Sequence, residues 1–261
     1  MLNKLLKKDL GRNLRWMWIL FVATIAAAVL DRGCKELGEY VGFFKILAIF
    51  FDSIFYALAI NVILQPFLRN FLNFTKSLYG DESYLTHTLP VTKRQIINAK
   101  YITAVTEIVL GFACLVVSLL IMFYTPTLFD ELQLLLLLLG GIDLSVALVL
   151  CLIIWLIVVE FLMFISIIFF AIVIAYQARE KKVLKTFLFT VAFAFASSTV
   201  LAVIMVIVLA CQGVDLASAT LTLNGTQLLS VVLTGITVYT TITIVFYFLC
   251  QKAFAKGVNV D

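Results

Sequence analysis

The sequence is poor in charge: only 13% of its 261 residues are Asp, Glu, Lys or Arg. Hydrophobic residues make up 64% of the chain, whereas a soluble domain is about half apolar and about a quarter charged. So few polar side chains could not cover the surface of a soluble protein. The composition therefore excludes a soluble domain, a disordered chain and a nucleic-acid-binding protein. It leaves an α-helical membrane protein that crosses the bilayer several times.

Proline, cysteine and histidine are scarce as well. The three prolines allow long uninterrupted helices. The five cysteines show no metal-ligand spacing, and the one histidine, His87, has no cluster of partners. We therefore expect the cysteines to be small buried hydrophobic residues rather than a disulfide framework or a zinc site. We expect no cofactor or metal to be bound by this chain.

Motifs for nucleotide binding and hydrolysis are absent from the sequence. It contains no G-x-x-x-x-G-K-[ST] phosphate loop, no H-E-x-x-H and no G-x-S-x-G. We therefore expect that the chain is not an enzyme and that it does not hold ATP in a phosphate loop.

Long apolar runs dominate what is present. A membrane-spanning helix needs about 20 apolar residues. Six stretches reach or approach that length: residues 16–30, 40–67, 101–123, 144–176, 186–211 and 228–250. They do not alternate apolar and polar residues as the strands of a membrane barrel would. The sequence predicts an all-α protein with six transmembrane helices, forming a single domain over residues 16–261.

Basic residues are distributed unevenly between the two sides of these spans. Of the 19 Lys and Arg residues, 16 lie in residues 1–15, segment 68–100, turn 177–185 and the C-terminal tail. Because cytoplasmic segments are enriched in Lys and Arg, both termini are expected inside the cell. The same rule argues against a seven-span alternative, in which the leucine-rich segment 132–139 would cross the membrane. We expect residues 132–143 to be an outer-surface or re-entrant segment.

The first 15 residues are predicted to form an amphipathic helix, with leucines on one face and basic residues on the other. Such a helix lies in the headgroup layer and turns its basic face toward anionic lipid. Asp9 falls on the apolar side and weakens the pattern.

Segment 68–100 is the only sizeable polar stretch. Its sequence predicts that the second helix continues past the membrane and breaks at Gly80-Asp81. Thr92-x-x-Gln95 is a capping-box pattern that opens the helix leading into the third span. Exposed apolar residues between these points favour a surface for a cytoplasmic partner. A loop that rests on the membrane with ordinary capping remains the alternative.

Four charged residues lie within or at the edge of the predicted spans. Charges at that depth are costly and usually face a bundle interior or a cavity. They either line a substrate path or hold helices together, and Glu107 shares a helix face with Lys100, which suggests an ion pair at the cytoplasmic edge. The four candidates are Lys45, Asp52, Glu107 and Glu160.

Residues 78–95 read LYGDESYLTHTLPVTKRQ. This stretch resembles the loop after the second span in permease subunits of bacterial ATP-binding-cassette (ABC) exporters of the type-2 class. The resemblance implies a cytoplasmic coupling helix between spans 2 and 3, a location in the bacterial plasma membrane, and a second permease that forms a dimer. It also implies a separate ATPase subunit that holds ATP and magnesium. The residues carried over to this coupling loop are Gly80, Asp81, Glu82, Tyr84, Leu85, His87, Leu89, Pro90, Thr92 and Arg94. The chain departs from the family picture at residues 212–227, which are short.

Three functions follow from these observations. The first is a permease that exports a hydrophobic or amphipathic cargo such as a peptide, a lipid or a drug. The second is an ion-coupled secondary transporter or channel that uses Asp52 and Glu160. The third is a membrane-embedded enzyme with the same two residues as its carboxylate pair, and no motif supports it.

Overall fold

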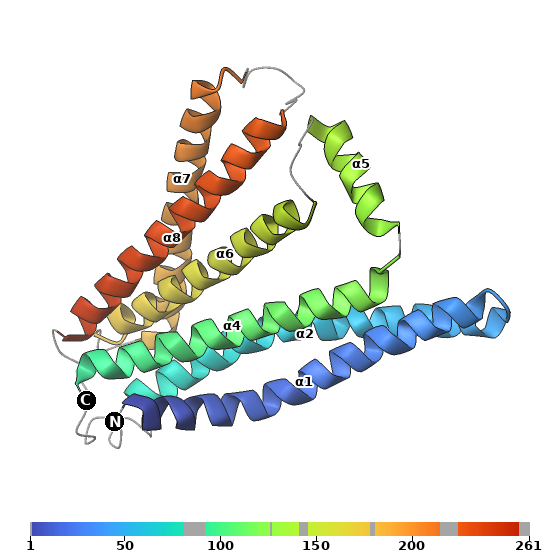
Figure 1. The fold of residues 1–261 in the computed structure, drawn as a ribbon. Coiled ribbons are helices and arrows are strands. Elements are labelled where there is room, and N and C mark those ends of the chain that lie inside the picture. The colour runs from blue at the N-terminus through green and yellow to red at the C-terminus, as the bar shows by residue number, and fades with distance from the viewer. Residues whose placement is uncertain are drawn as a thin grey trace. The chain divides into compact units, whose positions relative to one another are not determined.

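The computed structural model of the chain describes residues 2–80, 92–125, 127–140, 146–177, 181–214 and 224–255. Within these ranges there are seven helices and no strand. Figure 1 shows how the helices of each part run. The predicted all-α class is therefore confirmed. The chain divides into two compact units, residues 1–125 and residues 126–261. The predicted single domain over residues 16–261 includes parts of both units and stays a prediction.

The first unit consists of α1 (Leu2–Gly38), α2 (Gly42–Tyr79) and α4 (Lys93–Phe123). Each of these helices packs against the other two, and Figure 1 shows them running side by side. Apolar residues from all three helices form a shared core. One of its clusters contains Met17, Phe21, Val62, Cys114 and Leu115.

The second unit consists of α5 (Leu128–Gly140), α6 (Val146–Ala175), α7 (Lys182–Cys211) and α8 (Gly225–Ala255). Helix α6 contacts the other three. The ring of Phe170 on α6 lies 5.2 Å from that of Phe193 on α7 and 5.4 Å from that of Phe246 on α8. A Cβ atom at Gly235 of α8 would lie 2.9 Å from Cδ1 of Leu156, so glycine allows α8 to approach α6 closely.

Six of the seven described helices are long and apolar enough to cross a membrane. They are Asp9–Gly38, Gly42–Tyr79, Lys93–Phe123, Ala147–Ala175, Lys182–Cys211 and Gly225–Ala255. The number of helices that could span a membrane therefore agrees with the six predicted. Helix α5 has 13 residues. At 1.5 Å per residue it is about 20 Å long, which is too short for a hydrocarbon core of about 30 Å.

Helix α1 is longer than the sequence suggested. It runs for 37 residues without a break, whereas we expected a separate helix over residues 1–15 and a loop over residues 31–39. Ion pairs between residues one turn apart stabilise the helical conformation of its polar last turns. Lys35 Nζ lies 2.7 Å from Asp31 Oδ2, and Arg32 Nε lies 3.1 Å from Glu36 Oε1. The end of α1 is therefore helical where the sequence suggested a loop.

Candidate functional site

Helix α2 ends just before residues 81–91, and helix α4 begins just after them. Helix α2 continues to Tyr79, as predicted, and the N–H of Gly80 donates to the Lys76 carbonyl at 3.2 Å. Helix α4 begins after Thr92, whose Oγ1 accepts a hydrogen bond from the N–H of Gln95 at 3.4 Å. The Gln95 Oε1 in turn accepts one from the Thr92 N–H at 3.2 Å. The predicted capping box is therefore confirmed.

The remaining coupling-loop residues divide into two groups. Arg94 lies exposed in the first turn of α4. The other residues lie outside the described ranges, together with the predicted coupling helix, which stays a prediction. They are Asp81, Glu82, Tyr84, Leu85, His87, Leu89 and Pro90.

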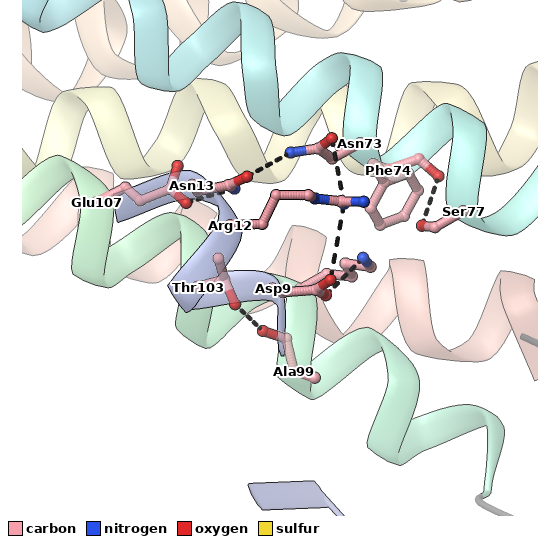
Figure 2. A network of polar contacts seen from close by, with 10 residues as sticks. Asp9, Arg12, Asn13, Asn73, Phe74, Ser77, Ala99, Thr103 and Glu107 are labelled. Atoms are coloured by element: carbon pink, nitrogen blue, oxygen red, sulfur yellow. Dashed lines mark hydrogen bonds and ion pairs between the residues drawn. The ribbon is translucent and has the colours of Figure 1, made fainter. Parts of the chain in front are cut away.

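A buried polar network joins α1, α2 and α4, and its central residue Glu107 lies at the middle of α4. Glu107 of α4 is fully buried, and its two carboxylate oxygens accept from different helices. Asn13 Nδ2 of α1 donates to Oε1 at 2.6 Å, and Asn70 Nδ2 of α2 donates to Oε2 at 2.8 Å. Asn73 Nδ2 donates to Asn13 Oδ1 at 3.0 Å, and Figure 2 shows Asn13 between Glu107 and Asn73. A single carboxylate thus links all three helices of the first unit. We call this set the Glu107 network and include in it Asp9, Arg12, Asn13, Asn70, Asn73, Lys100 and Glu107.

An ion pair between α1 and α4 extends the network. Lys100 Nζ lies 2.6 Å from Asp9 Oδ2, and the two side chains are 9% and 12% exposed. Arg12 Nη2 lies 3.8 Å from Asp9 Oδ1 and 3.4 Å from Asn73 Oδ1, as Figure 2 shows. The expected pairing of Lys100 with Glu107 is therefore wrong. Seven residues of helix, about 10 Å of rise, separate those two side chains, whereas Asp9 reaches Lys100 directly from α1.

Helical spacing explains why these polar residues meet inside the bundle. Asp9 and Asn13 are four residues apart on α1, and Asn70 and Asn73 are three apart on α2, so each pair shares a helix face. A buried polar group costs free energy unless it is hydrogen-bonded. A shift of one helix along another would separate these partners, so the network favours the observed register of α1 against α2 and α4.

A second charged cluster lies about 27 Å further along α1, counting 18 residues from Asn13 at 1.5 Å each. Lys35 Nζ bridges two carboxylates, at 2.7 Å from Asp31 Oδ2 on α1 and 2.9 Å from Asp52 Oδ1 on α2. It also lies 5.9 Å from the ring centre of Phe123 at the end of α4. We call Asp31, Lys35 and Asp52 the far-end cluster.

Of the four charges predicted within the spans, the three in the first unit do not form one site. Glu107 belongs to the Glu107 network and Asp52 belongs to the far-end cluster. Lys45 is exposed near the start of α2. Glu160 is half-buried on α6, in the second unit, and no hydrogen bond or ion pair reaches it from the described part of the chain.

Sequence reasoning missed several members of these clusters. Asp9 gave a signal, because it interrupts the apolar face of residues 1–15. The asparagines of α2 gave a weaker signal, since two amides three residues apart share one face of the helix and can meet the same polar partners. The partners Asn13 and Lys35 gave none, because they sit in a flank and a loop beside the predicted first span. Lys100 was recognised as a candidate for an ion pair, but with Glu107 instead of Asp9.

The described residues contain no group of three or more His, Cys, Asp or Glu side chains that could hold a metal ion. The five cysteines are free thiols. Cys34, Cys114 and Cys250 are buried as expected, whereas Cys151 and Cys211 are exposed. Comparison with protein-family models, curated proteins and solved structures finds no match for this chain.

Proposed function

We propose that the chain is the permease subunit of a type-2 ABC exporter in the bacterial plasma membrane. The observation that carries the proposal is the Glu107 network, which ties α1 to α2 and α4, the two helices that flank residues 81–91. Residues 78–95 resemble the loop on which such permeases dock a separate ATPase. In this proposal that ATPase binds ATP and magnesium, and this chain catalyses no reaction itself.

The helix ends offer a direct mechanical connection from this loop to the spans. Gly80 directly follows α2, and Thr92 directly precedes α4. A push on residues 81–91 therefore acts on both helices together. Helix α1 joins the movement because Asp9 and Asn13 bind Lys100 and Glu107 of α4. A packed and hydrogen-bonded bundle moves as a rigid body rather than deforming. ATP-driven closure of the ATPase would thus displace three spans at once.

The transport step requires a second permease subunit, identical or related, that pairs with this one. Cargo would leave the cytoplasm through or along the interface between them. The helices present many large apolar side chains on their outer faces, which suits a hydrophobic or amphipathic cargo such as a peptide, a lipid or a drug.

Co-purification and transport assays test the proposal. Tagged chain isolated from native membranes should bring down an ATPase subunit. Tyr84→Ala and Leu89→Asp should each lower ATP-dependent transport, because they alter the apolar loop surface that meets the ATPase. Phe129→Ala is the matched control, an exposed aromatic residue on α5 that should leave transport unchanged. Absence of any co-purified ATPase, together with full transport by both loop variants, would rule the exporter out.

The orientation is tested by labelling single cysteines in a cysteine-free background. A membrane-impermeant maleimide added to intact cells should leave Lys7→Cys and Lys252→Cys unlabelled and should label Glu131→Cys on α5. This result is expected because the basic segments favour the cytoplasm. Labelling of either terminal position would contradict the proposed orientation.

An ion-coupled transporter or channel remains the alternative function. Less supports this alternative, because Asp52 already pairs with Lys35. Asp52 and Glu160 also lie in unbroken helices, whereas such ion sites are commonly formed by interrupted ones. Transport driven by an ion gradient in proteoliposomes without ATP would favour this alternative over the exporter.

A further inference from the structure

The carboxyl group of Glu160 on α6 has no counterion in the second unit. Counting 14 residues from Val146 and 15 to Ala175 at 1.5 Å each, about 20 Å of helix separates Glu160 from either end of α6. The sequence of this unit has no Lys or Arg within residues 126–178 or 186–251. A lone acidic group at that depth is costly, so it points to a cationic partner that comes from outside the unit.

Glu160 lies on the side of α6 that faces α8. Leu156, one turn before it, packs against Gly235 of α8, where a Cβ atom would lie 2.9 Å from Leu156 Cδ1. Tyr239 follows Gly235 by the same four residues, and an electrostatic interaction links it to Glu160. Both residues are only half-buried, so a group from outside the chain can reach them. A carboxylate beside an aromatic ring is a combination that attracts organic cations.

An apolar crevice opens between the same two helices on the other side of the contact between Leu156 and Gly235. Ile153 and Val232 in its wall lie seven residues before Glu160 and Tyr239, about 10 Å along each helix and on the same helix faces. The Leu156 side chain lies between the crevice and Glu160 and can rotate to let an alkyl chain pass. The crevice is lined by apolar residues alone: Val149, Leu152, Ile153, Leu228, Leu229 and Val232.

We propose that Glu160 and Tyr239 bind the cationic amine of an amphipathic cargo whose alkyl chain lies in the crevice between α6 and α8. The inference rests on the proposed exporter function and deepens it by assigning a class of cargo. The bound ammonium neutralises the carboxylate that no basic side chain of the unit reaches. A resident lipid does not suit the site, because lipid headgroups stay about 15 Å from the bilayer midplane, whereas Glu160 lies midway along α6.

Two probes of equal chain length test the requirement for charge. Dodecylammonium is cationic and dodecanol is neutral, and their alkyl chains are long enough to extend from Glu160 into the crevice. Binding of each to the full chain and to Glu160→Gln is measured by calorimetry in phosphatidylcholine nanodiscs, so partitioning into the lipid cancels between the two proteins. We expect Glu160→Gln to weaken dodecylammonium binding about tenfold, the effect of losing one charge-assisted hydrogen bond, and to leave dodecanol binding unchanged. Unchanged dodecylammonium binding would overturn the proposal.

Matched variants locate the two ends of the probe. Glu131→Gln, which removes an exposed carboxylate on α5, should leave dodecylammonium binding as it is. Ile153→Trp should fill the crevice and weaken the binding of both probes, whereas Leu148→Trp, at an exposed position of α6 outside the crevice lining, should not. Equal binding by Ile153→Trp and Leu148→Trp would overturn the placement of the alkyl chain.

Chemical labelling of the unchanged protein tests the site without any variant. Dicyclohexylcarbodiimide, an apolar reagent, should modify Glu160 from the bilayer, and mass spectrometry of the peptides measures the extent. Dodecylammonium should slow this modification and dodecanol should not. No modification of Glu160, or equal rates with both probes, would overturn the proposal, and protection by sodium ion alone would overturn the assignment to cargo. All these measurements omit the ATPase, so a negative result leaves the proposed exporter function to its own co-purification test.

Discussion

The buried pair of Asp9 and Lys100 allows a quantitative test of how α1 is held against α4. Removing one partner of a buried ion pair costs about 3–5 kcal/mol, because it leaves a charge without a counterion. The two removals are not equivalent here. Arg12 lies 3.8 Å from Asp9 and remains its partner when Lys100 is replaced. Lys100 has no second carboxylate within ion-pair distance among the described residues.

We therefore expect Asp9→Leu to lower the free energy of unfolding by about 3 kcal/mol and Lys100→Leu by about 1–2 kcal/mol. The double variant should lie within about 1 kcal/mol of the unchanged protein, since two leucines leave no buried charge. Reversible unfolding of the full chain in mixed micelles measures each value. Glu36→Leu is the control: its pair with Arg32 has side chains that are 70% and 38% exposed, and its loss should cost less than about 1 kcal/mol.

Two results would refute this reasoning. If Asp9→Leu and Lys100→Leu both behave like the Glu36→Leu control, the pair contributes no stability and α1 is not held to α4 in this way. If Lys100→Leu costs more than Asp9→Leu, Arg12 does not stabilise Asp9 when Lys100 is absent.

Three further variants test other contacts by unfolding or amide exchange. Glu107→Ala should cost about 1–3 kcal/mol, because two buried amides lose their acceptor, and Glu107→Gln should cost less since it keeps one acceptor oxygen; equal losses would contradict this. Thr92→Ala should cost about 1 kcal/mol and speed amide exchange in the first turn of α4, whereas Thr92→Ser should change little; unchanged exchange would show that the cap is dispensable. Gly235→Leu should cost about 1–3 kcal/mol by pushing α8 from α6, and Gly235→Ala less, since the Leu156 side chain can rotate away; equal stability of Gly235→Leu and the unchanged protein would contradict that close approach.

The predictions that held depend on local properties of the chain. An apolar run long enough to cross the bilayer becomes a spanning helix wherever it packs, so six spans were predictable. The Thr92 cap was predictable because the residues that form it are three positions apart. The end of α1 was not predictable. Its last turns are polar and their composition suggests a loop, but ion pairs such as that between Lys35 and Asp31 keep them helical.

The partners of the buried charges were the least predictable part of the candidate site. Lys100 and Glu107 share a helix face, so the sequence favoured a pair between them, yet each binds a residue on another helix. Asp52 lies on the same helix as Lys45, yet its partner is Lys35 of α1. In each case the partner lies on a different helix, where sequence spacing carries no information about distance.

The sequence by itself determined that this protein is helical and has six segments long and apolar enough to cross a membrane, because the length and composition of each apolar run are sufficient for that conclusion. Only the tertiary structure decided which polar side chains meet. Asn13, Asn70 and Glu107 lie on three helices and come together only in one register of the bundle. That register depends on the packing of α1, α2 and α4 as a whole, and on the cost of leaving any one of these buried groups without a hydrogen bond.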